Sequence, residues 1–144
     1  MLISDLLKNQ VMISAESHQT VLEVASLMVQ HNIGAVPVLK DGKLTGIFSE
    51  RDLMSRVVVG GKDPASTKVV QVMTEDPLTI APTDTLETCM TLMKRHGFRH
   101  LPVCSGSELK GVISLRDILL QNLDEKDDEV RMMRAYLHST PDAG

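Results

Sequence analysis

The chain contains an internal repeat, which constrains its fold more than any other feature of the sequence. A shift of sixty-five positions, the separation of Gly46 from Gly111, aligns residues 20–52 with residues 85–117 without a gap. A fixed period indicates copies of one supersecondary unit. A unit of under about 50 residues cannot bury both its helices and its sheet, so the two copies should pack against each other. The identical pairs are Thr20/Thr85, Leu27/Leu92, Met28/Met93, His31/His96, Pro37/Pro102, Val38/Val103, Leu44/Leu109, Gly46/Gly111, Ser49/Ser114, Arg51/Arg116 and Asp52/Asp117.

Each copy predicts the same local structure. In the first copy, Thr20 and Glu23 form a capping-box pattern ahead of an apolar helical face. Asn32, and Gly97 in the second copy, tolerate the left-handed conformation that ends a helix. Two short strands, 36–39 and 44–48, then flank an Asp-Gly turn, and Ser49 opens a second helix. An extended segment is expected before each first helix, around residues 12–13 and 78–80.

The expected fold class is α/β (α+β), with the order strand, helix, strand, strand, helix occurring twice. The two repeats should pack through their sheets with pseudo-twofold symmetry. The expected organisation is one module over residues 1–144. It comprises repeat 1 (5–61), a connector (62–69), repeat 2 (70–123) and an acidic C-terminal tail (124–144) with a short helix over 130–137.

The composition argues against nucleic acid and the membrane as partners. The net charge is −4, and aromatic residues make up 2% of the chain. Neither a basic footprint nor base-stacking side chains are therefore expected. No segment has the apolar length needed to cross a bilayer, and the start of the chain lacks the pattern of a secretory signal, so we expect a cytoplasmic protein. Cys89 and Cys104 match no zinc or redox spacing and are expected to be reduced buried thiols.

We expect neither a catalytic site nor a metal site. The sequence has no nucleophile elbow, no phosphate-binding Gly-rich loop and no Cys with a nearby base. His31 and His96 share a register, but no Cys, Asp or Glu joins them at ligand spacing. Both histidines close equivalent helices, where a cation favours the helix C-terminus.

The segments Ser49-Glu-Arg-Asp52 and Ser114-Leu-Arg-Asp117 admit two interpretations. In the first, each Ser-x-x-Asp is only a capping box, in which serine accepts from a backbone amide and aspartate returns a hydrogen bond. In the second, the carboxylate accepts the hydroxyls of a ribose, and the helix N-terminus with the serine favours a phosphate.

The paired motifs resemble the CBS domain over roughly residues 5 to 123. The resemblance is carried by Gly-Ala-Val-Pro-Val and Arg-His-Leu-Pro-Val, together with Gly-Ile-Phe-Ser-Glu-Arg-Asp-Leu and Gly-Val-Ile-Ser-Leu-Arg-Asp-Ile. It implies a sensor of adenosine-containing ligands in which Asp52 and Asp117 hold the ribose.

The resemblance also implies two unequal clefts, each combining the Ser-x-x-Asp of one repeat with strands of the other. The first cleft should hold a phosphate because Arg99, His100 and Arg116 bring basic groups, although Arg99 and His100 also suit a solvated hairpin edge. The second cleft should take an adenosine with less to hold a phosphate. The expected first-cleft residues are Ser49, Arg51, Asp52, Thr79, Ile80, Arg99, His100 and Arg116, and the second-cleft residues are Met12, Ile13, Gly34, Ala35, Val36, Ser114 and Asp117.

The leading expectation is therefore a non-catalytic regulatory module for a ligand of the AMP, ATP, NAD(H) or S-adenosylmethionine class, acting through an unidentified partner protein. A homodimer is expected, because CBS pairs commonly associate through helix faces. The alternative is a purely structural dimerisation module whose Ser-x-x-Asp motifs only cap helices. An enzyme fragment is disfavoured, because nothing joined to the repeats is long enough to be catalytic.

Overall fold

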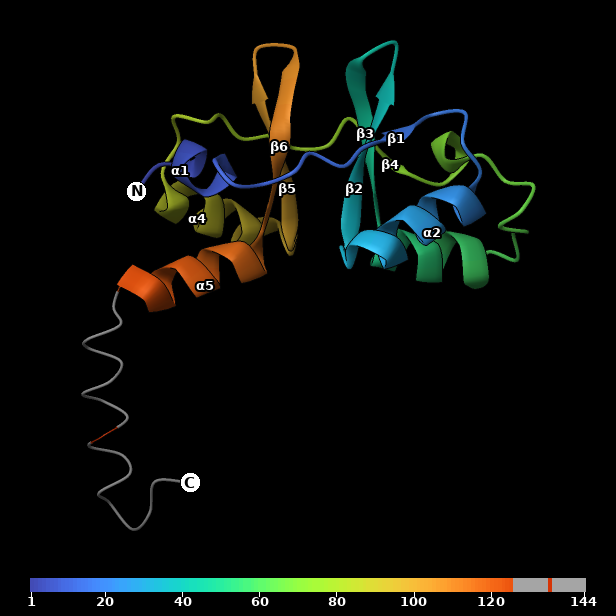
Figure 1. Ribbon diagram of the computed structural model, residues 1–144. Helices are drawn as coiled ribbons and strands as arrows, with labels where there is room; N and C mark the ends of the chain where they lie inside the picture. Colours follow the sequence, from blue (N-terminus) through green and yellow to red (C-terminus); the bar gives the residue numbers. More distant parts are fainter. Residues whose placement is uncertain (126–134, 136–144) are drawn as a thin grey trace.

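The computed structural model describes residues 1–125 and Ala135, and shows two similar halves side by side (Figure 1). The predicted tail helix over 130–137 lies, apart from Ala135, outside the described residues. Among those residues, no helix is both long and apolar enough to cross a membrane.

The first half holds a four-stranded sheet in the order β1-β2-β3-β4. Its strands are β1 (Ala15–Glu16), β2 (Ala35–Lys40), β3 (Lys43–Ser49) and β4 (Thr74–Glu75). β1 is parallel to β2, and the other pairs are antiparallel. The predicted Asp-Gly turn joins β2 to β3, with positive φ at Asp41 and Gly42. Helix α2 (Val21–His31) precedes β2, and α3 (Glu50–Asp52) continues after β3 as a π-helical segment, η1 (Leu53–Val58).

The second half repeats this plan with β5 (His100–Ser105), β6 (Glu108–Ser114), α4 (Leu86–His96) and α5 (Leu115–Glu125). Its equivalent of β1 is reduced to one parallel bridge, Ile80 to Val103. The bridge from Ala15 to Val38 lies at the same register, so the two first strands begin at Ala15 and Ile80. The extended segment predicted around residues 12–13 thus lies just ahead of the observed strand.

The two hairpins lie next to each other at the centre, with helices on the outer and lower sides (Figure 1). β3 contacts β6 across this centre. Each half has its own core, one containing Val24, Val36 and Phe48 and the other Cys89, Leu101 and Ile113. The predicted mixed α/β architecture, with two repeats packed through their sheets, is confirmed.

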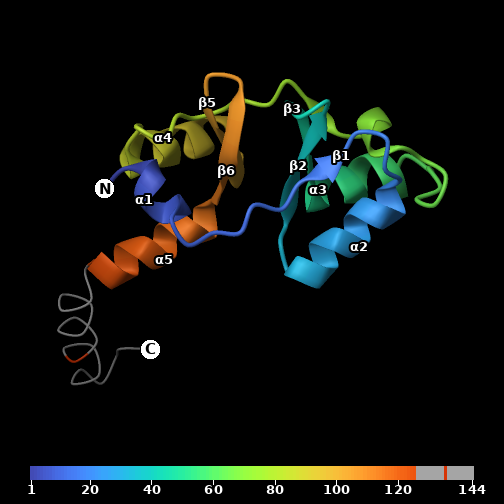
Figure 2. The same ribbon diagram turned by 45° about the horizontal axis from the view of Figure 1, so that its top comes forward.

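Two short helices are exchanged between the halves. The helix that precedes the first half in the sequence packs in the second core, and the helix that precedes the second half packs in the first core. Helix α1 (Ile3–Leu7), at the start of the chain, buries Ile3 in the second core. The 3₁₀ helix η2 (Val69–Gln71) buries Val69 in the first core. The two exchanges are equivalent, because both short helices bind the same position of the repeat. The amide of Ile3 donates to the carbonyl of Asp84 at 2.9 Å, and the amide of Val69 donates to the carbonyl of Gln19, the equivalent residue, at 2.8 Å. Figure 2 shows the segment after α1 crossing from one half to the other.

The helix caps explain why the helices begin and end where they do. The Thr20 hydroxyl accepts from the amide of Glu23 at 3.2 Å, and the Glu23 carboxylate accepts from the amide of Thr20. Asn32 and Gly97 adopt the left-handed conformation at the ends of α2 and α4. These caps are confirmed at the predicted residues.

Gly46→Ala should destabilise the protein by about 1–3 kcal/mol, because a Cβ at Gly46 would lie 2.7 Å from the backbone carbonyl oxygen of Thr74 on β4. The control is Lys43→Ala, an exposed position on the same strand, which should cost less than about 0.5 kcal/mol. Urea unfolding of both variants makes the comparison, and equal losses would show that β4 does not constrain Gly46.

Candidate functional site

The two Ser-x-x-Asp segments lie at the start of α3 and α5, directly after the last strand of each repeat. The carboxylate Oδ2 of Asp52 accepts from the amide of Ser49 at 3.0 Å, and the Ser49 hydroxyl accepts from the amide of Asp52 at 3.2 Å. At the second motif, Oδ2 of Asp117 accepts from the amide of Ser114 at 3.1 Å. The amide of Asp117 donates to the Ser114 hydroxyl at 3.0 Å. The capping box is therefore present in both repeats.

The carboxylate of Asp52 is almost fully engaged by the protein. The residue is 6% exposed, and the Thr74 hydroxyl lies 3.1 Å from Oδ1 and 3.3 Å from Oδ2. Nε of Arg56 lies 3.7 Å from Oδ1, and the same guanidinium donates to the carbonyl of Met73 at 2.6 Å. A ribose hydroxyl that approached Asp52 would have to share or replace the hydrogen bond from Thr74.

Asp117 is more open. Its side chain is half-buried, and Oδ2 also accepts a long hydrogen bond of 3.4 Å from Nε2 of Gln10. Among the described residues no hydrogen bond reaches Oδ1 of Asp117. Gln10 lies in the segment that follows α1, so a residue from outside the second repeat reaches the aspartate of that repeat.

His100 lies between the two repeats. A Cβ built on Gly34, at the start of the first repeat's hairpin, would meet Cε1 of His100 at 3.3 Å. Burial lowers the pKa of His100, and the nearby Arg99 lowers it further, while the carboxylates of Glu50 and Asp117 oppose the shift. The lowered pKa favours the neutral imidazole, in a position that charges from both repeats reach.

The remaining predicted residues differ in how accessible they are. Arg51, Thr79, Arg99, Arg116 and Met12 are exposed, whereas Ile80, Ala35 and Val36 are buried. Ile13 packs against the first core. The buried residues can offer a ligand only backbone groups or an apolar edge.

The structure adds Gln10, Arg56 and Thr74 to the groups around the two aspartates, and Glu50 to those around His100. Glu50 follows Ser49 within the Ser-x-x-Asp motif, so the sequence already indicated that it lies near the site. The other three reach the aspartates from the segment that follows α1, from η1 and from β4, and nothing in the repeat alignment points to them.

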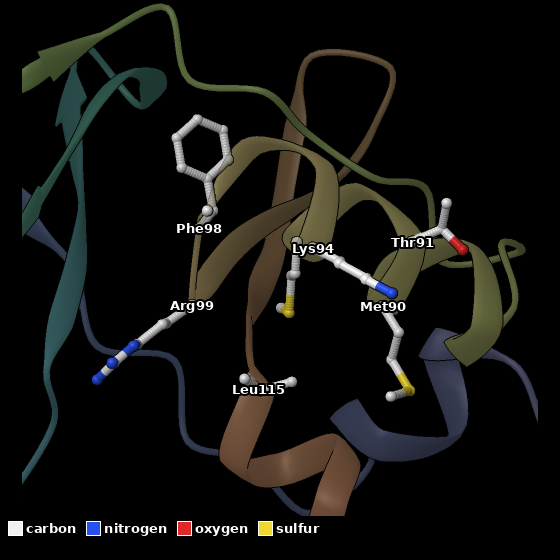
Figure 3. Close-up of a pocket in the computed structure, with 8 residues that line it drawn as sticks. Met90, Thr91, Lys94, Phe98, Arg99 and Leu115 are labelled. Carbon is white, nitrogen blue, oxygen red and sulfur yellow. The ribbon is translucent and has the colours of Figure 1, made fainter.

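Among the described residues, neither Cys89 nor a cluster of metal-binding side chains forms a second site. Burial, and secondarily the charge of Asp84, raises the pKa of Cys89 to about 11, which disfavours a thiolate nucleophile. Within residues 1–125 and Ala135, no three His, Cys, Asp or Glu side chains gather as a metal site. A hollow of about 450 Å³ between α4 and the start of α5 contains Arg99 but neither aspartate (Figure 3). In that view Arg99 extends away from Lys94 and Met90.

The pH dependence of stability should report the burial of His100. A histidine whose pKa is lowered by folding contributes stability above its unfolded pKa of about 6.5 and loses it as the pH falls through the lower folded value. The melting temperature should therefore fall less between pH 7.5 and pH 5 in His100→Gln than in the parent. Exposed His18→Gln should behave like the parent. An identical pH profile for parent and His100→Gln would contradict the assignment.

Two tandem α/β repeats with a capped aspartate at the start of each second helix define a paired-repeat module. The sequence model of the CBS domain matches residues 3–59 and 69–123. The chain belongs to the CBS domain family.

The chain is similar to curated proteins of different lengths. The CBS domain-containing protein YhcV of Bacillus subtilis is 34% identical over 124 residues, covering 86% of this chain and 87% of YhcV. The chain spans 60% of the length of the mitochondrial CBS domain-containing protein CBSX3 of Arabidopsis thaliana, to which it is 34% identical. It also matches 25% of an inosine-5'-monophosphate dehydrogenase of Korarchaeum cryptofilum, at 31% identity, so the module also occurs within an enzyme.

Solved structures agree on the fold. A putative signal-transduction protein with CBS domains from Burkholderia ambifaria superposes with a TM-score of 0.83 at 28% identity, covering 88% of this chain and 96% of the other. A CBS domain protein from Pyrobaculum aerophilum complexed with AMP superposes with a TM-score of 0.74 at 27% identity, covering 84% and 97%.

Proposed function

We propose that this chain is a non-catalytic regulatory module that binds an adenosine-containing ligand in the clefts between its repeats. The observation that carries the proposal is Asp117, whose Oδ1 has no hydrogen bond among the described residues and whose charge reaches His100. The AMP-bound relative from Pyrobaculum aerophilum supports the ligand class. The AMP, ATP, NAD(H) and S-adenosylmethionine classes all remain candidates.

A ribose at Asp117 would use the unpaired Oδ1 and replace the long hydrogen bond from Gln10. Hydrogen bonds to a charged acceptor are worth about 1.5–3 kcal/mol each. Two bonds of ordinary length from a ribose should therefore outweigh the single bond of 3.4 Å from Gln10. The predicted second cleft, with Gly34, Ala35 and Val36 as its strand edge, would receive the adenosine. A ligand in the Asp52 cleft would also have to replace the hydrogen bond from Thr74 to Asp52, so we expect the Asp117 cleft to fill first.

The proposal is tested by thermal unfolding with and without AMP, ATP, NAD, NADH and S-adenosylmethionine. A ligand at about a hundredfold above its dissociation constant adds roughly 2.7 kcal/mol of stability, which for a domain of this size raises the melting temperature by roughly 10 °C. At least one compound should produce this rise. If none does, the sensor function is rejected.

One observation favours a second candidate, a purely structural dimerisation module. Both capping boxes are complete without a ligand, and in Asp52 the cap is reinforced by Thr74 and Arg56. In this alternative, loss of either aspartate lowers stability and changes nothing else. The ligand panel separates the two functions.

We also propose a homodimer formed through helix faces. Exposed apolar side chains lie on α2, η1 and α5, and Figure 1 shows both α2 and α5 in the lower half of the molecule. These side chains are Leu22, Val29, Met54, Val58, Leu119 and Leu120. A two-fold dimer would bring copies of one patch together.

Sedimentation velocity should show a dimer for the parent and a monomer for Met54→Glu, since a carboxylate in the buried patch is costly. The control is Val11→Glu, which changes an exposed valine outside any helix and should stay dimeric. A parent protein of monomer mass at every concentration would end the dimer proposal.

A ligand can change the state of such a dimer, or of a partner protein, only if it binds one state more tightly than the other. We expect this coupling to regulate a partner protein and expect no catalysis by the chain itself. A cytoplasmic location also stays a prediction.

A further inference from the structure

The side chain of Glu50 folds over Gly34, at the edge of the second cleft. A Cβ built on Gly34 would meet the carboxylate oxygen Oε1 of Glu50 and, at 3.3 Å, Cε1 of His100. Glu50 from the first repeat and His100 from the second therefore approach the same point. The backbone fixes this position, because the amide of Glu50 donates to the carbonyl of Gly34 at 3.0 Å.

The carboxylate of Glu50 is available to a ligand. Glu50 is exposed, and among the described residues no hydrogen bond or ion pair involves its side chain. Its charge still acts on His100, where it opposes the effect of burial on the pKa of the imidazole. A charged group with no protein partner, at the junction of two repeats, acts directly on whatever enters there.

The repeat alignment shows that the first repeat has the Glu50 carboxylate and that the second repeat has no acidic residue at the equivalent position. Leu115 occupies the position equivalent to Glu50, and Arg99 the position equivalent to Gly34. The second repeat thus offers a cation and an apolar side chain where the first offers a carboxylate and no side chain. Burial lowers the pKa of His100, which favours the neutral imidazole, and the charges that act on this ring are the carboxylates of Glu50 and Asp117 and the guanidinium of Arg99. The two carboxylates outnumber the one guanidinium beside the ring.

We propose that Glu50 sets the charge selectivity of the second cleft, disfavouring adenosine compounds with a 5′ phosphate relative to those whose 5′ substituent is neutral or positively charged. This inference rests on the proposed function, since it assumes that an adenosine compound occupies the cleft. An unpaired carboxylate close to a phosphate raises the free energy of the complex, and the same carboxylate attracts a cation.

Isothermal titration of adenosine, AMP and S-adenosylmethionine into the full chain and Glu50→Gln tests the inference. Glu50→Gln keeps the shape of the side chain and removes its charge. It should raise the affinity for AMP about tenfold, leave that for adenosine within about twofold, and lower that for S-adenosylmethionine. Glu50→Leu, which copies the residue found at position 115, should give the same order.

The control is Glu108→Gln at the turn end of the second hairpin, where Glu108 pairs with Lys110 at 3.1 Å and should not influence the ligand. Repeating the titrations in an Asp52→Asn background restricts binding to the Asp117 cleft. An unchanged ratio of AMP to adenosine affinity in Glu50→Gln, with adenosine still bound, overturns the role of Glu50 and leaves the proposed function standing. Absence of binding by all three compounds to every protein, together with no rise in melting temperature from ATP, NAD or NADH, overturns both.

Discussion

Ile3→Ala should lower the free energy of unfolding by about 2–5 kcal/mol, the range for deletion of a fully buried branched side chain. Ile3 is 0% exposed and lies in the second core, although it stands at the start of the chain, ahead of the first half. The substitution leaves a cavity under α1 that the neighbouring side chains Leu86 and Ile118 fill only in part. Urea denaturation followed by circular dichroism measures the loss.

The matched control is Leu2→Ala, one residue away and 41% exposed, which should cost less than about 1 kcal/mol. If Ile3→Ala were as mild as Leu2→Ala, α1 would not be part of the second core. The exchange of short helices between the halves would then be wrong.

Asp117→Asn should remove most of the stabilisation that an adenosine compound confers on the parent. Loss of a charged acceptor that binds a ribose weakens affinity by about a hundredfold. At a ligand concentration that adds roughly 2.7 kcal/mol to the parent, the variant should gain only about 0.4 kcal/mol. Asp52→Asn should retain more of the ligand effect, because Asp52 is already engaged by Thr74 and Arg56. Thermal unfolding with the best ligand of the panel gives both values.

Ser114→Ala separates the loss of the cap from the loss of the ligand. It removes the hydroxyl that accepts from the amide of Asp117 at 3.0 Å and keeps the carboxylate. It should cost about 1 kcal/mol of stability without ligand and preserve most of the ligand effect. Equal ligand effects in the parent and Asp117→Asn would leave only the capping role for that aspartate.

The local physics of the repeat made most of the fold predictable. The identities in one register required two copies of one unit, and residue types at their ends located the caps. Thr20 with Glu23 begins α2, and Asn32 and Gly97 end equivalent helices with left-handed backbones. The Asp41-Gly42 turn sets the first hairpin. Each of these features depends on neighbours within a few positions in the chain, which a single sequence displays.

Features that depend on distant segments were not predictable in the same way. The first strand begins at Ala15 because its bridge to Val38 fixes the register, whereas the apolar pair at residues 12–13 suggested an earlier start. The exchange of α1 and η2 joins residues that are far apart in the chain, such as Ile3 and Asp84. The same holds for the hydrogen bonds from Thr74 to Asp52 and from Gln10 to Asp117, which make the two aspartates unequal.

The charges around His100 include a carboxylate that the sequence analysis did not place there. The cationic pocket that Arg99 and His100 suggested for a phosphate stays a prediction; burial lowers the pKa of His100, and Glu50 approaches its ring from the other repeat. The sequence contains Glu50 within the motif, yet only the packing of the two repeats brings it to His100.

Binding of an adenosine compound at the junction of the two repeats can be measured by an amide chemical-shift titration of the full chain with adenosine. We expect saturable shifts at Gly34, His100 and the turn from Ser114 to Asp117, with smaller ones from Ser49 to Asp52. Absence of saturable shifts, or shifts confined to the hollow between α4 and α5 near Lys94 and Phe98, would contradict binding at this junction.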